Sequence, residues 1–384
     1  MKITRIGSDA AEAADGLSVF DAEPPGGKAE PPAKGRAEMP GMDLGIDLGT
    51  SRVTIYASGR GIVLREPSVI AVESATGRMI ACGKDAYAML GRTPDSIEAV
   101  QPLNKGVISD YDYAEQMLRY FVRKVCAYKI LKPRAAVSVP ASVTEVEQRS
   151  VIEAVRASGA RRVVLIEESM AAAIGAGLDV AVPRGSMVAD LGGGTTDVAV
   201  MSLKGVVASL SIRVGGNDLD EAIVRYLHNK YNHAVGRLTA EQVKMRIGCA
   251  LPQEDDPAMP VKGRDAVTGL PCVREVHSSE ILEAIREPLE QMVAAVQRVI
   301  ENTPPELTGD ILDSGILLTG GTAQLNGMAE LMTRRTGVVC RVAENPSDCV
   351  AIGTGKALKY VGVLSSGVYD ISRFTTSALD PTGV

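Results

Sequence analysis

The chain has little of several things that would point to particular classes of protein. It holds no tryptophan and three phenylalanines among 384 residues, so its cores must come from aliphatic side chains and methionine. Its six cysteines lie far apart without a C-x-x-C pair, which argues against a disulfide framework or a thiolate metal cluster. No apolar run approaches the ~18–20 residues of a membrane-spanning helix, and no apolar stretch near the start is typical of a secretory signal.

An excess of positive charge is also missing. The formal net charge is −6, from 41 basic and 47 acidic residues. This balance argues against recognition of nucleic acid through a globally basic surface, and we expect no nucleic-acid partner. The charged fraction of 23% and the hydrophobic fraction of 45% are those of an ordinary globular protein, and the length suggests two or three domains.

The ends of the chain differ from its middle. Residues 1–41 are rich in proline, glycine and alanine without a sustained apolar period, which predicts a disordered tail. The stretch from about residue 365 onward is rich in serine, threonine and glycine and is expected to fray.

Between the two ends, patterns of strands and helices alternate, which predicts an α/β architecture. Thr144 and Thr239 each open a segment with the spacing of a capping box, and residues 253–271 are expected to form a solvated loop or the edge of a small subdomain. The buried strands are expected near residues 135–139, 163–166, 187–191 and 315–319, and the helices near 113–128, 145–158, 217–229 and 279–301.

One pattern occurs twice, about half the folded chain apart. The first copy is LGIDLGTS at residues 44–51, and the second is MVADLGGGTTD at residues 187–197. Each copy joins an apolar strand, an aspartate and a glycine-rich turn with hydroxyl groups, and a second β-rich segment follows. The duplication predicts two related domains that face each other.

The residue types in this pattern suit phosphate and a divalent cation. Glycine lets backbone amides approach an anion closely, and threonine and serine add hydroxyl donors. An aspartate cannot favourably face phosphate itself, so it would hold Mg²⁺ through water. Two such turns would clamp a nucleotide tail, although two hairpins without a ligand remain the alternative. A third glycine turn, at residues 318–323, lies between a strand and a helix and suits a phosphate or the ribose–adenine region.

These segments resemble the actin–Hsp70–sugar-kinase superfamily of two-lobed ATPases and, more closely, the bacterial actin family MreB/Mbl. Further matching segments follow in family order over roughly residues 42–360, among them GIVLREPSV at 61–69, MLGRTP at 89–94, GVISD at 106–110, IEESMAAAIG at 166–175, DEAI at 220–223 and TPPEL at 303–307. The resemblance implies an actin-like two-lobed ATPase fold, built from duplicated ribonuclease-H-like domains with four subdomains.

The resemblance also implies boundaries for these parts. Lobe I would span residues 42–185 with a small subdomain inserted at about 74–106. Lobe II would span 186–342 with a small subdomain inserted at about 217–280. Residues 343–384 would hold a helix that returns to lobe I and the frayed C-terminus.

The resemblance further implies a site for ATP and Mg²⁺. Glu168 would orient or deprotonate the attacking water, with the Thr195 hydroxyl as its helper, and Asp47 and Asp190 would position Mg²⁺ through water. The residues implied in nucleotide binding are Thr50, Ser51 and Arg52 in the first phosphate loop, Gly192, Gly193, Gly194 and Thr195 in the second, and Gly216, Glu241, Lys244, Gly320, Gly321, Thr322 and Ala323 elsewhere.

Several of these residues have a structural alternative. Glu168 would also serve as an acid favoured at a helix start, and Glu241 and Lys244 would form a solvated ion pair on one helix face. Glu147 is a rival for the general base, but its capping-box position favours a structural role.

Three positions depart from the family pattern. Arg52 stands where asparagine is usual, Ser169 where proline is usual, and Thr322 in place of a third glycine. The Arg52 cation could contact phosphate directly or turn to solvent, and Ser169 would loosen the start of its helix. None of the three removes a core catalytic group.

As a function, the resemblance implies an MreB-like ATPase that forms homopolymeric filaments. It would work in the cytoplasm at the inner face of the cell membrane, with lipid and membrane proteins of the cell-elongation machinery as partners, and organise cell-wall synthesis in rod-shaped cells. Ile130 and Leu131, which lie between lysines, are the candidate membrane contacts, unless they only pack a helix end. The alternatives are a nucleotide-binding paralogue without hydrolysis, a small-molecule kinase and, least supported, a chaperone ATPase.

Overall fold

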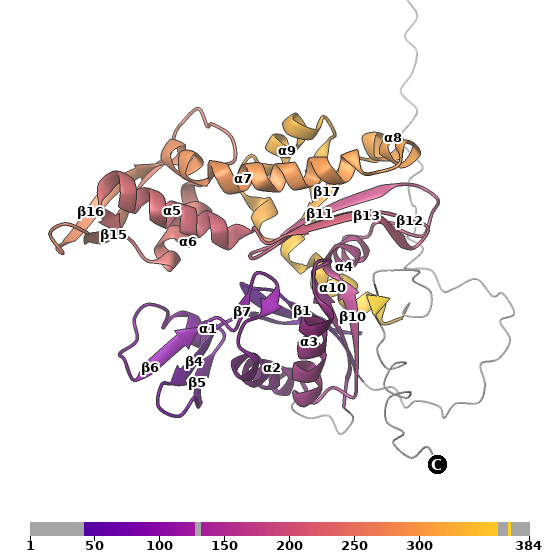
Figure 1. Ribbon diagram of the computed structural model, residues 1–384, viewed down its shortest axis with the longest axis horizontal. Helices are drawn as coiled ribbons and strands as arrows, with labels where there is room; N and C mark the ends of the chain where they lie inside the picture. Colours follow the sequence, from indigo (N-terminus) through magenta and orange to yellow (C-terminus); the bar gives the residue numbers. More distant parts are fainter. Residues whose placement is uncertain (1–41, 127–131, 360–367, 370–384) are drawn as a thin grey trace, which may run out of the picture.

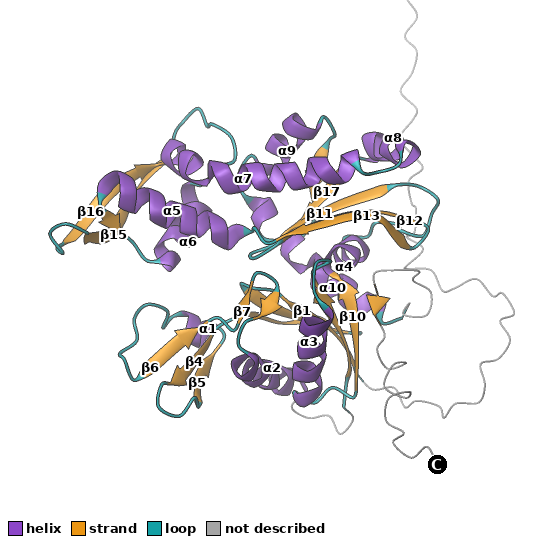
Figure 2. Cartoon of the chain, viewed as in Figure 1, coloured by secondary structure: helices purple, strands orange, loops and turns teal. Residues whose placement is uncertain are grey.

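The computed structural model describes residues 42–126, 132–359 and 368–369 and shows two lobes, each built around a mixed β-sheet (Figure 1). Helices and strands alternate along both lobes (Figure 2), so the expected α/β class and the two-lobed arrangement are confirmed.

Lobe I is organised around a six-stranded sheet in the order β19-β10-β9-β1-β2-β3. Its strands are β1 (Asp43–Leu48), β2 (Arg52–Ala57), β3 (Gly61–Pro67), β9 (Arg134–Val139), β10 (Arg162–Glu167) and β19 (Val368–Tyr369). Alternate residues of β1 face opposite sides of the sheet, and each side is covered by different helices. Leu44 and Ile46 pack with α2 (Tyr111–Cys126) and α3 (Glu145–Ala157), whereas Gly45 meets the backbone of α10 (Cys349–Ala357).

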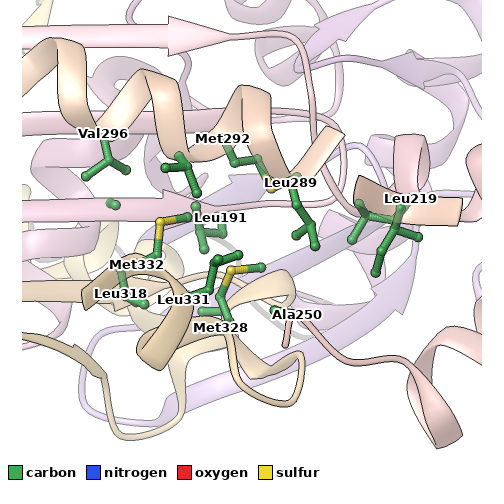
Figure 3. Close-up of a cluster of buried hydrophobic side chains, with 14 of the residues drawn as sticks. Leu191, Leu219, Ala250, Leu289, Met292, Val296, Leu318, Met328, Leu331 and Met332 are labelled. Carbon is green, nitrogen blue, oxygen red and sulfur yellow. The ribbon is translucent and has the colours of Figure 1, made fainter. Parts of the chain in front are cut away.

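Lobe II repeats the arrangement with a five-stranded sheet in the order β13-β12-β11-β17-β18. Its strands are β11 (Ser186–Leu191), β12 (Thr196–Ser202), β13 (Gly205–Ile212), β17 (Ile316–Thr319) and β18 (Cys340–Val342). One face packs against α7 (Ser278–Glu301) and α9 (Met328–Thr336), and α8 (Pro305–Ser314) lies next to β11. Leucine, valine and methionine fill the core (Figure 3), as expected of a chain without tryptophan.

Each lobe carries a small subdomain at the same end of the molecule (Figure 1). That of lobe I contains β4 (Ile70–Glu73), β5 (Met79–Cys82), α1 (Lys84–Tyr87) and β6 (Ile97–Val100), and the short strands β7 (Leu103–Asn104) and β8 (Val107–Ile108) follow. That of lobe II contains α5 (Gly216–Tyr231), β14 (His233–Ala234), α6 (Arg237–Ile247), β15 (Ala258–Asp265) and β16 (Pro271–His277).

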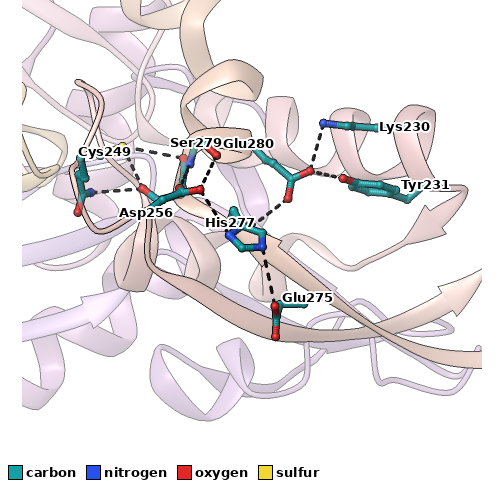
Figure 4. A network of polar contacts seen from close by, with 10 residues as sticks. Lys230, Tyr231, Cys249, Asp256, Glu275, His277, Ser279 and Glu280 are labelled. Carbon is teal, nitrogen blue, oxygen red and sulfur yellow. Dashed lines mark hydrogen bonds and ion pairs between the residues drawn. The ribbon is translucent and has the colours of Figure 1, made fainter.

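Polar contacts fix the start of α7 against the small subdomain of lobe II (Figure 4). Glu280 accepts a hydrogen bond from the Tyr231 hydroxyl and lies 3.1 Å from the Lys230 ammonium, while Asp256 accepts from the Ser279 amide at 2.8 Å. These bonds tie α5 and the loop before β15 to α7, so the small subdomain is fixed on the larger one.

Two local expectations in this region are wrong. Residues 253–271, expected as a loop or an edge, contain β15, which is the middle strand of the sheet β14-β15-β16. Helix α6 begins at Arg237 with Gly236 as its N-cap, so Thr239 does not start the helix. The capping box at Thr144, by contrast, is confirmed at the start of α3.

The chain passes between the lobes at two helices that touch each other. Helix α4 (Glu168–Gly175) leads from β10 toward β11, and α10 follows η2 (Pro346–Asp348) back to the sheet of lobe I. A Cβ added at Gly353 would lie 1.7 Å from the carbonyl oxygen of Ala171, so the backbones of α4 and α10 are in direct contact. Only glycine permits so close a crossing.

Candidate functional site

A cavity of about 510 Å³ lies between the lobes, where the glycine-rich turns of the two hairpins meet. It collects nearly all of the residues predicted to form the site: Asp47, Thr50, Ser51, Arg52, Glu168, Asp190, Gly192, Gly193, Gly194, Thr195, Gly216, Glu241, Lys244, Gly320, Gly321 and Thr322. Ala323 does not line the cavity. It lies in η1 (Thr322–Gln324), and its side chain is buried in the core of lobe II.

The two hairpins place their aspartates at equivalent positions. Asp47 is the next-to-last residue of β1 and pairs with Thr54 of β2. Asp190 is the next-to-last residue of β11 and pairs with Asp197 of β12. Because the turns face each other across the cavity, the two carboxyl groups approach from opposite lobes, as the sequence duplication predicts.

The two turns are in direct contact. A Cβ at Gly194 would lie 2.3 Å from the Thr50 hydroxyl oxygen, and one at Gly193 would lie 2.2 Å from that of Ser51. The Ser51 hydroxyl donates to the Asn217 side chain at 2.9 Å, across the lobes. Side chains at either glycine would therefore separate the lobes and cover the backbone amides.

Burial makes the two aspartates costly to ionise. Desolvation raises the pKa of Asp47 to about 6, although the Arg52 charge and the Ser138 hydroxyl oppose the shift. Desolvation likewise raises the pKa of Asp190 to about 7, opposed by the Thr319 hydroxyl, which donates at 2.6 Å. Their mutual repulsion adds to the shift of Asp190. A cation between them would favour both charged forms.

The donor set fits Mg²⁺. This ion prefers oxygen ligands and keeps several waters, so it binds through one or two carboxylates together with phosphate oxygens. Asp47 and Asp190 offer those carboxylates next to turns suited to phosphate. The residues that the structure describes contain no cluster of three or more histidine, cysteine, aspartate or glutamate side chains able to hold a metal alone. An ion here would therefore need ligands from water and phosphate.

Glu168 is the first residue of α4 and is buried, with only 6% of its surface exposed. The Thr195 hydroxyl donates to its Oε2 at 3.3 Å. Desolvation, followed by the charge of Asp197, raises the pKa of Glu168 well above its ordinary value. A raised pKa makes the Glu168 carboxylate a stronger proton acceptor, which is what a general base requires.

Asp197 is a neighbour of Glu168 that the sequence analysis missed. It is fully buried on β12 and accepts from the Ala141 amide at 3.4 Å. Burial raises the pKa of Asp197 too, and the Asp197 charge adds to the rise in the pKa of Glu168. Its signal was available in the second hairpin, because the register of a tight hairpin pairs Asp190 with the acid seven residues later.

The rival base, Glu147, has a structural role. Its carboxylate accepts from the Thr144 amide at 2.8 Å, which completes the capping box of α3, and it pairs with Arg213 at 3.1 Å. It does not line the cavity.

The far end of the cavity is formed by α5, α6 and η1. The Lys244 ammonium lies 2.7 Å from Asp220 and donates to the Gly216 carbonyl at 2.7 Å, so it holds α6 against α5. The Thr322 hydroxyl donates to the Gly192 carbonyl at 2.8 Å, which ties η1 to the second turn. Glu241 faces the cavity but pairs with Tyr87 of lobe I, not with Lys244, and the sequence analysis did not anticipate this contact.

Arg52 turns toward the protein. Its guanidinium donates to the carbonyl of Ser347, in the middle of η2, at 3.2 Å. The adjoining Asp348 accepts two hydrogen bonds from Arg65, at 2.6 and 2.9 Å. The departure from the family pattern at position 52 therefore places a cation at the rim of the cavity, within reach of Asp47.

The predicted membrane contacts, Ile130 and Leu131, lie outside the described residues. Within the described part of the chain, no helix is both long enough and apolar enough to cross a bilayer.

Comparisons with known proteins identify the family of the chain. The model of the MreB/Mbl protein family matches residues 41–366. The cell shape-determining protein Mbl of Bacillus subtilis is 45% identical over 317 residues, which cover 82% of this chain and 95% of that protein. The cell shape-determining protein MreB of Escherichia coli is 47% identical over 325 residues, covering 83% and 94%.

Solved structures give the same result. MreB5 of Spiroplasma citri bound to ADP superposes with a TM-score of 0.80 at 36% identity, covering 84% of this chain and 97% of that one. A MamK double helical filament, at 20% identity and a TM-score of 0.72, shares the fold and covers 83% and 99%. The duplicated hairpins, the cavity between them and these matches together show that the chain belongs to the MreB/Mbl family.

Proposed function

We propose that this protein is an actin-like ATPase that binds ATP with Mg²⁺ between its lobes, assembles into filaments and determines cell shape. The observation that carries the proposal is the convergence of Asp47 and Asp190 on one cavity from two equivalent hairpins. The relatives support it: Mbl and MreB are named cell shape-determining proteins, and MreB5 was solved with ADP and with AMPPNP.

Each group in the cavity has a task in this proposal. The amides and hydroxyls of the two turns would bind the phosphates, and Asp47 and Asp190 would hold Mg²⁺ through water. The ion would neutralise charge on the phosphates. Glu168, oriented by Thr195, would accept a proton from the attacking water, and Asp197 would keep the basicity of Glu168 high. Positioning and charge stabilisation supply most of the rate in phosphoryl transfer.

Self-association has support on the surface of lobe II. Leu270, at the β15–β16 turn, is 65% exposed, and Leu312, on α8, is 62% exposed. Figure 1 shows β15 and β16 at one end of the lobe and α8 at the other. Apolar side chains at opposite ends of one lobe suit a head-to-tail contact, which builds an open filament when the rotation between successive copies does not close a ring.

We further propose that the filaments lie on the cytoplasmic face of the cell membrane, contact lipid through Ile130 and Leu131, and organise cell-wall synthesis with membrane proteins of the elongation machinery. The support is the pair of large aliphatic residues between two lysines, which anionic lipid would attract.

Pelleting of the purified protein with ATP and Mg²⁺, with and without anionic vesicles, tests the proposal. We expect filaments that pellet with nucleotide, and we expect Leu270→Glu to abolish them while calorimetry shows unchanged ATP affinity. Val146→Glu, at another exposed apolar position, is the matched control. Absence of nucleotide binding by calorimetry would overturn the proposal, and a strictly monomeric protein that binds ATP would overturn its filament part.

A further inference from the structure

Three polar contacts join the small subdomain of lobe I and the segment after it to α5 and α6 of lobe II, at the mouth of the cavity. The Tyr87 hydroxyl donates to Oε2 of Glu241. The Arg237 guanidinium donates to the Gln101 side chain at 2.8 Å, and the Lys105 ammonium lies 3.2 Å from Asp218. We call these three pairs the clasp. None of them belongs to the turns or to the carboxylates at the phosphate end.

Tyr87 is the part of the clasp that reaches the cavity. It ends α1, and its ring packs on the small apolar core around Val69, Ala71 and Ala86. Both Tyr87 and Glu241 line the 510 Å³ cavity. Burial and the nearby Glu241 carboxylate raise the pKa of the Tyr87 hydroxyl, so it stays protonated and remains the donor. Packing fixes the ring before the bond forms, which lowers the entropic cost of the contact.

The outer two pairs, Arg237–Gln101 and Lys105–Asp218, contribute less because they lie closer to solvent. They line a neighbouring cavity of about 240 Å³ beyond Thr50 and Gly194. The Lys105 side chain is 44% exposed, and water and salt screen such a pair. Tyr87–Glu241 is a half-buried bond to a charged acceptor, a class that contributes more than neutral or exposed contacts.

The place of Glu241 decides which end of a nucleotide it meets. A carboxylate repels phosphate, and the phosphate-binding turns lie at the other end of the cavity, so Glu241 faces the nucleoside. One of its oxygens accepts from Tyr87, which leaves the other to accept from a hydroxyl or amino group of the nucleoside. Tyr87 thereby fixes the rotamer of a group that would bind the ligand.

We infer that Tyr87 is a positioning residue that acts through Glu241: it holds lobe I closed over the nucleoside, and nucleotide leaves only after the Tyr87–Glu241 bond breaks. This inference rests on the proposed binding of a nucleotide and adds to it the residue that sets the rate of release. Within the clasp, the Tyr87–Glu241 bond contributes most to holding the lobes closed, and the two outer pairs contribute less.

Release of a fluorescent ADP from the full-length protein with Mg²⁺ is the direct test. Tyr87→Phe keeps the ring and its packing, and we expect release to be about tenfold faster, as for the loss of one hydrogen bond to a charged group. Lys105→Gln is expected to change the rate by about twofold or less. Tyr226→Phe is the matched control, because Tyr226 donates to Glu283 at 2.5 Å in the same kind of pair away from the cavity.

A double-mutant cycle identifies the route of the effect. In a Glu241→Gln background, Tyr87→Phe is expected to add little to the rate of ADP release. Additive effects of the two substitutions, or an unchanged release rate for Tyr87→Phe, would overturn the inference.

Hydrogen exchange of the nucleotide-free protein separates this inference from the proposed function. Tyr87→Phe is expected to speed exchange in both α1 and α6, although the substitution lies in α1 alone. A wild-type protein that bound no nucleotide would overturn the proposed function, while linked exchange of α1 and α6 would still support the clasp. Faster exchange confined to α1 would contradict it.

Discussion

The two glycine-rich hairpins occupy equivalent places in their lobes but differ in their side chains. The turn of lobe I, Gly49–Ser51, carries two hydroxyls and is followed by the Arg52 cation. The turn of lobe II has three successive glycines, and its Asp190 pairs with a second acid, Asp197, where Asp47 pairs with Thr54. At the turns themselves, lobe I therefore contributes two hydroxyl donors and a positive charge, whereas lobe II contributes successive glycine amides and a second carboxyl group beside Asp190.

The difference shows how a duplicated scaffold divides its work. Near Asp47, the Arg52 cation and the Ser138 hydroxyl limit the rise in pKa that burial causes. Near Asp190, burial and the Asp197 charge give a larger shift. We expect the first hairpin to govern how tightly a nucleotide is held, and the second to govern hydrolysis and the response to pH.

Substitutions of Glu168, which the Thr195 hydroxyl of the second hairpin orients, and of Thr50 in the first hairpin should separate these two roles most clearly. Glu168→Gln is expected to lower ATP turnover by about 10²–10⁴-fold with little change in affinity, since it removes the base and leaves the turns intact. Thr50→Ala is expected to weaken ATP binding by about tenfold with a smaller effect on turnover of bound ATP. Single-turnover hydrolysis and calorimetry measure both, with Glu147→Gln as a control. Equal losses of affinity in both variants would end the distinction between the hairpins.

The stability of the nucleotide-free, metal-free protein should fall as pH rises from about 4 to about 7. In this range the folded protein binds more protons than the unfolded chain, because the pKa of Asp47 is raised to about 6 and that of Asp190 to about 7. Ionisation of Asp190 alone would lower the free energy of unfolding by at most about 4 kcal/mol over this pH range. Urea unfolding at several pH values measures this slope.

The two aspartates serve as controls for each other in that experiment. Asp190→Asn should flatten the pH dependence more than Asp47→Asn, since its pKa shift is larger. Mg²⁺ with nucleotide should also flatten it by favouring the charged forms. Stability that rose with pH in the free protein would contradict the electrostatics described for the cavity.

Arg52→Asn should have a smaller effect than Glu168→Gln or Thr50→Ala. The variant loses a cation near the phosphate end and the bond to the Ser347 carbonyl, so ATP affinity is expected to fall by about fivefold. Because the effect is electrostatic, it should shrink with added salt. An affinity that rose instead would mean that Arg52 holds the cavity partly shut through Ser347. Calorimetry at two salt concentrations distinguishes the outcomes.

Much of the fold could be predicted from the sequence because the patterns that indicate its strands, helices and turns are local. The strand at β11 and the helix at α7 follow from apolar periodicity, and the place of Asp47 and Asp190 follows from a repeated turn whose chemistry is legible residue by residue. Thr144 with Glu147 gave the start of α3 for the same reason, since a capping box is complete within four residues.

The contacts that the sequence could not give join distant segments. Tyr87 and Glu241 lie 154 positions apart, and nothing local to either residue indicates the bond. β15 was missed because Lys262 and Arg264 are exposed and Pro260 interrupts the strand, a pattern shared with solvated loops. Ala323 was predicted to bind nucleotide because it ends the third glycine turn, but the short helix η1 directs its methyl group into the core.

The crossing of α4 and α10 has a mechanical consequence. The chain passes between the lobes where these two helices touch, and the clasp lies at the outer rim of the cavity. The crossing can therefore act as a hinge, and the rim is the part that moves farthest. A rotation too small to disturb the packing at Gly353 would be amplified into a wide displacement at Tyr87. Since Glu168 is the first residue of α4, the carboxylate proposed as the general base lies beside this crossing and would stay nearly still while the rim moves.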